Sequence, residues 1–196
     1  MYKSVSELIE NYEQHTSNDR NLCKQGYIDE KTYREHCDLY YSEFCKELEK
    51  LEQQSIIKQL LSHIVSLSDK TNWNEESSLW IDCVSLVPDR VFIPYLINIL
   101  KIQKENVLYF SVLTVIKYLP EEIGEEAVPG ICEAISANNP FWTEYVFAEA
   151  FETLIFNRNE MAGEFVRKSC LSDVPFIKEW ALYYRDNWLE ELERND

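Results

Sequence analysis

Glycine and proline are scarce in this sequence, with 4 and 6 occurrences among 196 residues. The four glycines are scattered at positions 26, 124, 130 and 163, so the chain has neither a glycine-rich phosphate loop nor a Gly-x-Ser-x-Gly elbow. Nucleotide hydrolysis and acyl transfer therefore lack their usual sequence motifs. Because 45% of the residues are hydrophobic, the composition is typical of a folded, helix-rich protein rather than of a disordered acidic chain.

Long apolar runs are also missing. The N-terminal segment Met1–Leu8 has no signal-peptide core, and the most apolar stretch, Val107–Leu119, is interrupted by Ser111, Thr114 and Lys117. We expect neither a signal peptide nor a membrane-spanning helix.

The six cysteines form no Cys-x-x-Cys pair, and their spacings do not fit a zinc site. Cys83, Cys132 and Cys170 lie within apolar helical patterns, where a free cysteine packs as a small hydrophobic residue. We expect reduced core cysteines in a cytoplasmic protein, with a disulfide or redox role as the alternative.

Histidine is equally sparse. His15, His36 and His63 lie on separate segments, and none belongs to a His-Glu-x-x-His motif. Neighbouring residues on a helix point about 100° apart, so His36 and Asp38 with Cys37 between them cannot all converge on one metal ion. The sequence predicts surface histidines, no metal site and no cofactor.

Acidic side chains are the abundant candidates for a functional site, and they are densest at Glu121-Glu122 and Glu125-Glu126. Negative charge at a helix start is favoured by about 0.3–1 kcal/mol per exposed residue, which is one explanation for this cluster. A magnesium site is another, but the chain shows no basic groove for a phosphate-bearing substrate. We do not expect an enzyme.

The N-terminal part of the chain predicts helices. Ser4, with Glu7 three residues later, forms a capping box for a first helix that is expected to fade near residues 17–19. Asp29 is expected to cap a long second helical segment. The apolar stripe of that segment restarts out of phase, which predicts a break near residues 53–55.

Two parts of the chain differ in pattern, residues 1–72 and residues 73–196. In the second part an apolar set ending at Val87-Pro88 recurs 32 residues later as a set ending at Leu119-Pro120. The helix after each set repeats as well, at an offset of 35 residues. A period of this length is typical of stacked helix pairs.

The segment Val112–Pro120, followed by residues 127–135, resembles a HEAT-like repeat, and the resemblance covers about residues 74–190. It implies an all-α protein, in which an N-terminal helical hairpin precedes a short right-handed α-solenoid of HEAT-like helix pairs with a C-terminal capping helix. Asp89-Arg90 fits the Asp–Arg pair of such repeats, whereas the next copy has Glu121-Glu122. An irregular helical bundle is the alternative architecture.

The negative charge is concentrated toward the C-terminus. Residues 120–196 hold 17 acidic and 6 basic residues, a net charge of −11, whereas residues 1–119 hold 18 and 13, a net charge of −5. Such a surface repels phosphate backbones and anionic membranes and attracts basic surfaces. The alternative is that the acidity only maintains solubility.

Aromatic residues are interleaved with these acids. Trp142 and Tyr145 follow Asn139-Pro140, and we expect one or both to be exposed as apolar anchors, although core packing is the alternative. The candidate partner-binding residues are seven acids and these two aromatics: Glu121, Glu122, Glu125, Glu126, Glu133, Glu160, Glu164, Trp142 and Tyr145.

A small acidic helical protein of this kind is similar in character to bacterial immunity proteins, which neutralise nuclease toxins in interbacterial, contact-dependent competition. This resemblance implies a basic protein partner whose active-site surface is occluded, with no direct binding to nucleic acid or membrane. The alternatives are a non-catalytic adaptor or scaffold that holds a peptide or protein and, less expected, an enzyme for carboxylate-assisted hydrolysis.

Overall fold

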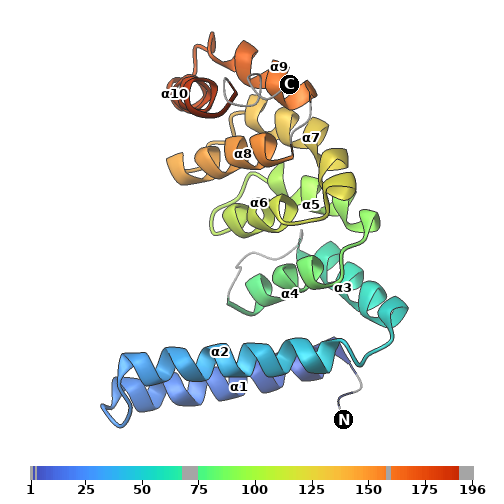
Figure 1. Cartoon of the computed structure of the whole chain (residues 1–196), viewed down its shortest axis with the longest axis vertical. Helices are drawn as coiled ribbons and strands as arrows, with labels where there is room; N and C mark the ends of the chain where they lie inside the picture. Colours follow the sequence, from blue (N-terminus) through green and yellow to red (C-terminus); the bar gives the residue numbers. More distant parts are fainter. Residues whose placement is uncertain (1, 3, 68–74, 158–159, 190–196) are drawn as a thin grey trace.

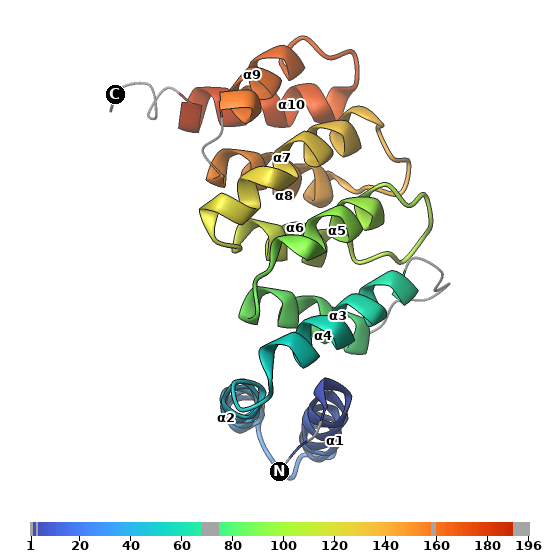
Figure 2. The ribbon, with the colours of Figure 1, turned by 90° about the vertical axis from the view of Figure 1, so that its right-hand side faces the viewer.

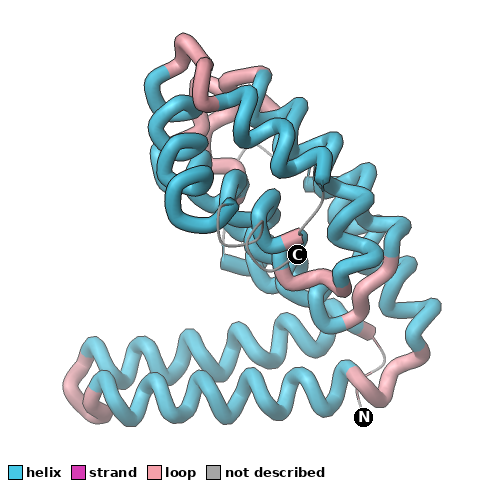
Figure 3. Tube along the Cα trace, turned by 45° about the horizontal axis from the view of Figure 1, so that its top comes forward, coloured by secondary structure: helices cyan, strands magenta, loops and turns pink. Residues whose placement is uncertain are grey.

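The computed structural model of the chain describes residues 2, 4–67, 75–157 and 160–189, with the side chains of 75–77, 188 and 189 left aside, and the described part is all-helical (Figure 3). None of its helices is both long and apolar enough to cross a membrane. The α-helices are α1 (Val5–Lys24), α2 (Glu30–Leu48), α3 (Gln53–Leu67), α4 (Glu75–Leu86), α5 (Ile93–Leu100), α6 (Tyr109–Lys117), α7 (Glu121–Ser136), α8 (Glu144–Phe156), α9 (Glu160–Ser169) and α10 (Pro175–Tyr184). A 3₁₀ turn, η1 (Arg90–Phe92), precedes α5, and a π-helical turn (Arg185–Leu189) follows α10.

Helices α1 and α2 form an N-terminal hairpin whose two starts are capped by side chains. The Ser4 hydroxyl accepts a hydrogen bond from the Glu7 backbone N–H at 3.2 Å, and the Asp29 carboxylate accepts one from the Thr32 N–H at 2.7 Å. Each bond satisfies an N–H group that has no partner within its own helix. Both caps predicted from the sequence are confirmed.

A polar cluster ties α1 to α2. Asp19 Oδ2 lies 2.7 Å from Nδ1 of His36 and accepts a hydrogen bond from the Tyr40 hydroxyl at 2.9 Å. The bond to His36 is the main cause that lowers the pKa of Asp19 below its ordinary value. The prediction that the first helix fades near residues 17–19 is wrong, because these contacts hold α1 in helical form and it continues to Lys24.

The chain is interrupted at residues 49–52, between the end of α2 and the start of α3, rather than at 53–55. Helix α3 then packs against α4 and α5, although the sequence division at 72 assigned it to the N-terminal part. The stack of helix pairs therefore includes α3. The predicted boundary between 72 and 73 lies outside the described residues.

Beyond the hairpin, the helices lie in two layers. One layer contains α3, α5, α7 and α9, and the other contains α4, α6, α8 and α10; within each layer, every helix contacts the next (Figures 1 and 2). The hairpin lies across the end of the stack that is formed by α3 and α4 (Figure 1). Each connection thus carries the chain from one layer to the other, so that alternate helices run in the same direction.

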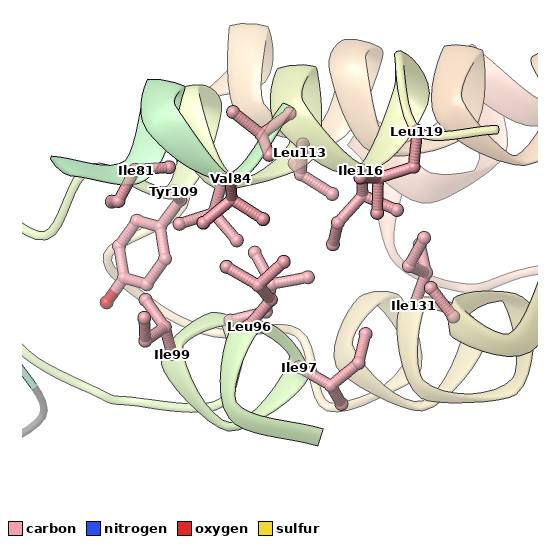
Figure 4. Close-up of a cluster of buried hydrophobic side chains, with 14 of the residues drawn as sticks. Ile81, Val84, Leu96, Ile97, Ile99, Tyr109, Leu113, Ile116, Leu119 and Ile131 are labelled. Atoms are coloured by element: carbon pink, nitrogen blue, oxygen red, sulfur yellow. The ribbon is translucent and has the colours of Figure 1, made fainter. Parts of the chain in front are cut away.

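The core fills the space between these two layers. Figure 4 shows Leu113 and Ile116 of α6 facing Leu96 and Ile97 of α5, and all four side chains are buried. Close contact of branched aliphatic side chains across the layers removes apolar surface from water, which stabilises the stack by about 25 cal/mol per Å².

Cysteines contribute to this core. Cys83, Cys132 and Cys170 are buried, as their apolar surroundings in the sequence predict, and all six cysteines are free thiols. Burial raises the pKa of Cys132 to about 11. Since the thiolate is the reactive form, this side chain behaves as a hydrophobic residue at neutral pH.

Gly130 lets α7 approach α5 closely. A Cβ atom at this position would lie 2.5 Å from Cγ2 of Ile97, a buried side chain. We expect Gly130→Ala to lower the free energy of unfolding by about 1–2 kcal/mol in urea titrations, because overpacking outweighs the helix propensity that alanine adds. Ser136→Ala, an exposed change on the same helix, is expected to stay within about 0.5 kcal/mol. Equal or greater stability of Gly130→Ala would contradict the close approach.

Candidate protein-binding edge

The connections from one helix pair to the next gather at one edge of the stack. Helices α4, α6 and α8 end at this edge, and η1, α7 and α9 begin there (left side of Figure 2). The loops that join α5 to α6 and α7 to α8 lie at the opposite edge. We call the first of these the turn edge.

Five of the seven predicted acids lie at the turn edge. Helices α7 and α9 pack side by side and begin at the same edge, so their first turns are neighbours. The carboxylates are all exposed: Glu121, Glu122, Glu125 and Glu126 on α7, and Glu160 on α9. The helix starts also favour them, because the N-terminal end of a helix carries partial positive charge.

Among the described residues, a basic partner is found for one of these five acids. Glu126 forms an ion pair with Arg90 of η1 at 3.2 Å, which links two successive turns of the edge. Within the described part of the chain, none of the other four carboxylates has a basic partner. Within the described residues, the turn edge therefore presents four exposed carboxylates without a basic partner.

The two remaining acids do not belong to this group. Glu133 lies in the second half of α7 and pairs with Lys101, at the end of α5, at 2.6 Å. Glu164 pairs with Lys168 one turn further along α9, at 3.2 Å. Their charges are already compensated within the protein, and Glu133 lies roughly 10 Å or more along α7 from the first two turns.

A buried ion pair fixes α6 to α8 behind the turn edge. The Lys117 ammonium lies 2.8 Å from a Glu149 carboxylate oxygen and 3.5 Å from Glu152, and the Thr114 hydroxyl donates to Glu149 at 2.8 Å. Burial lowers the pKa of Lys117, but the hydrogen bond and charge of Glu149, with the charge of Glu152, outweigh it, so the pKa is raised. Lys117 is therefore charged at neutral pH and adds no uncompensated positive charge to the edge.

Close packing places the end of α8 against the start of α7. The buried Asn157 side chain donates to the Thr153 carbonyl at 2.7 Å, and a Cβ atom on Gly124 would lie 2.0 Å from its amide oxygen. Only glycine permits this approach without a shift. The contact brings the last turn of α8 beside the acidic first turns of α7.

Exposed apolar side chains stand at the same edge, and the sequence interpretation missed them. Tyr118 and Phe156 are 62% and 57% exposed, and their rings meet edge to face with centroids 5.9 Å apart. Leu86 is exposed at the equivalent position of α4. A sequence signal for Leu86 and Tyr118 was present, because Leu86-Val87-Pro88 recurs as Tyr118-Leu119-Pro120. In both copies the middle residue is buried and the residue before it is exposed. We call Leu86, Tyr118 and Phe156 the apolar ridge.

The two predicted aromatic anchors lie elsewhere. Trp142 is 5% exposed and packs against Phe147 and Tyr109, with ring centroids 5.3 and 6.0 Å away, so its prediction as an exposed anchor is wrong. Tyr145 is 76% exposed, but it is the second residue of α8 and lies at the edge opposite the acids.

Open grooves adjoin the hairpin, and two of them contain ionisable side chains of interest. A groove of about 270 Å³ between the hairpin and α4 contains Asp82, whose pKa is raised by burial, and Arg20, whose Nε donates to the Tyr33 hydroxyl. A wider groove of about 420 Å³ runs along the hairpin past His15 and Tyr40. None of the predicted partner-binding residues lines either groove, and no three His, Cys, Asp or Glu among the described residues are arranged to hold a metal ion.

Comparison with known proteins gives no match to a family model, to a curated protein or to a solved structure.

Proposed function

We propose that this protein is a non-catalytic acidic binding protein that docks its turn edge on a basic protein and occludes that partner's active site. The most specific form of the proposal is an immunity protein against a nuclease toxin of a bacterial competition system, acting in the cytoplasm. The supporting observation is the group of five exposed carboxylates at one edge, of which four have no basic partner among the described residues.

Electrostatics explains why such an edge suits a nucleic-acid enzyme as partner. An enzyme that binds phosphate backbones presents lysine and arginine side chains around its active site. Opposite potentials speed the encounter of the two proteins and disfavour wrong partners. Once docked, the acidic edge takes the place of the nucleic acid, so that inhibition needs no chemistry by this protein.

The architecture in this proposal is a short right-handed α-solenoid of HEAT-like helix pairs. Its support is the alternation of layers, in which α3 to α10 form four successive pairs and each helix packs on the next helix of its own layer. A solenoid presents its turns as a continuous edge, because equivalent ends of successive repeats lie next to one another. The turn edge is suited to a broad contact for this reason.

An adaptor that holds a peptide is the second candidate, and the groove of about 420 Å³ along the hairpin favours it. Its walls combine Leu8 and Phe44 with the polar groups of His15 and Glu43. Salt dependence separates the two functions, because charge-driven docking weakens as salt screens the charges, whereas an apolar groove is little affected.

The test is affinity capture from the native cell at low ionic strength, followed by binding and activity measurements on the purified partner. We expect a basic protein whose activity on nucleic acid is lost at a one-to-one ratio. Neutralising Glu121, Glu122, Glu125 and Glu160 to glutamine is expected to weaken binding at least tenfold, mainly through slower association.

A matched variant removes the same number of charges away from the turn edge. Its substitutions to glutamine or asparagine are at exposed acids of the opposite edge and α10: Glu105, Glu144, Asp173 and Glu179. This control is expected to bind within about threefold of the wild type, because charges more than a Debye length of about 10 Å away are largely screened at 0.1 M salt. Equal losses in the two variants would contradict docking at the turn edge.

A further inference from the structure

The apolar ridge is built by the fold. Leu86, Tyr118 and Phe156 lie at the C-terminal ends of α4, α6 and α8, and each is followed by a residue that is buried. Helices packed side by side have axes about 8–10 Å apart, which is close enough for large side chains at the ends of α6 and α8 to meet. Tyr118 and Phe156 form an exposed aromatic pair at the edge that carries the exposed carboxylates of α7 and α9.

Carboxylates flank the two rings. Glu152 lies one turn before Phe156 on α8 and is half exposed, and Glu121 and Glu122 follow Tyr118 across the α6–α7 turn. Asn157 packs on Gly124, so the Phe156 end of α8 lies beside the same acidic turns. Aromatic faces rimmed by carboxylates are the surroundings that a guanidinium group prefers, because it stacks on a ring while its N–H groups bind carboxylate oxygens in pairs.

A cation of the chain itself lies close to one of these rings. The Lys117 ammonium lies 5.3 Å from the centroid of the Tyr118 ring. Lys117 is buried and neutralised by Glu149 and Glu152, whereas the Tyr118 ring is 62% exposed. A second cation can therefore reach the ring from solvent.

We infer that the apolar ridge is the anchor point of the proposed interface, and that Tyr118 and Phe156 stack arginine side chains of the basic partner between the carboxylates of the turn edge. This inference rests on the proposed function and adds the residue type that the partner presents. Arginine is favoured over lysine because a planar guanidinium is more weakly hydrated and stacks on rings, whereas an ammonium is a compact, strongly hydrated charge.

The probe is a pair of peptides of equal charge, nona-arginine and nona-lysine, titrated into the full-length protein by calorimetry at 50 mM salt. We expect the wild type to bind the arginine peptide at least fivefold more tightly. The double variant Tyr118→Leu, Phe156→Leu keeps an apolar surface but removes both rings, and its affinity for the arginine peptide is expected to fall about tenfold. Its affinity for the lysine peptide is expected to change less than threefold.

Two controls make the outcome decisive. Tyr145→Leu removes an exposed aromatic at the opposite edge and is expected to leave both affinities unchanged. An arginine preference that survives in the double leucine variant, or an equal loss for both peptides, overturns the stacking inference.

Failure of the proposed function gives a different result. The glutamine variant of Glu121, Glu122, Glu125 and Glu160 is expected to bind both peptides more weakly than the matched charge control does. If the two variants bind alike, docking at the turn edge is contradicted, and the inference built on it falls as well. If the glutamine variant is weaker but the leucine variant is unaffected, only the ridge is overturned.

Discussion

Replacing Glu149 by leucine is expected to lower the free energy of unfolding by about 3–5 kcal/mol. The change leaves the buried Lys117 ammonium without its 2.8 Å partner and the Thr114 hydroxyl without its acceptor. Glu152, at 3.5 Å, remains near the ammonium, so we expect the lower end of this range. Urea unfolding followed by circular dichroism measures the loss.

The double variant Lys117→Met, Glu149→Leu is the matched control. Removing both charges avoids an uncompensated buried ion, so the double variant is expected to recover to within about 1 kcal/mol of the wild type. Glu152→Gln alone is expected to cost less than about 1 kcal/mol, because that carboxylate is half exposed. An unchanged unfolding midpoint for Glu149→Leu would show that the ion pair is not formed in solution.

The pH dependence of this effect has a definite sign. The pKa of Lys117 is raised in the folded state, so the contribution of its charged form is complete below the ordinary lysine value of about 10.5. It is lost as the pH rises through the higher, folded-state pKa. The free energy of unfolding of the wild type, measured relative to that of the double variant, is therefore expected to stay constant from neutral pH to about 10 and to fall above that range.

Local signals in the sequence predicted the features that depend on neighbouring residues. Ser4 and Asp29 cap their helices as predicted, because a capping side chain bonds to an N–H only three residues away. Pro175 is the first residue of α10, a position that proline favours because the first turn of a helix does not need its missing N–H group. The buried cysteines followed from their apolar surroundings in the same way.

Contacts between residues that are distant in the sequence could not be predicted from the sequence alone. His36 contacts Asp19, 17 residues away, only because the hairpin folds back on itself. Glu133 is compensated by Lys101, which follows from the packing of α7 against α5 and from no local pattern. Proximity of charged groups in space cannot be derived from a single sequence when both partners lie on different helices.

The acids of the turn edge could be predicted from the sequence, but the aromatic residues beside them could not. Glu121, Glu122, Glu125, Glu126 and Glu160 were among the seven acids predicted to bind a partner, and the packing of α7 beside α9 places the starts of these two helices together. The aromatic residues beside them were not recognised, since exposure depends on which way a side chain points at a turn. Tyr118 stands in an apolar run that favoured burial, yet it caps the end of α6 and faces outward.

Trp142 was predicted to be exposed but is buried. Replacing it is expected to cause the second large loss in the free energy of unfolding. The segment before α8 turns back at Asn139. The side-chain amide of Asn139 donates to the Ile102 carbonyl at 2.8 Å, and the backbone carbonyl of Asn139 accepts from the Trp142 backbone N–H at 3.0 Å. This turn directs the indole inward onto Tyr109 and Phe147. The sequence suggested an exposed position because Phe147 and Phe151 already supplied an inward stripe.

We expect Trp142→Ala to lower the free energy of unfolding by about 3–5 kcal/mol, the cost of removing a large aromatic side chain from a core. Trp142→Phe is expected to cost clearly less, because the buried indole N–H has no hydrogen-bond partner among the described residues and only volume is lost. Tyr145→Ala, by contrast, is expected to stay within about 0.5 kcal/mol, since its side chain is 76% exposed. If Trp142→Ala instead left the urea midpoint unchanged and weakened partner binding alone, Trp142 would be a surface anchor after all, and the turn edge would not contain the whole interface.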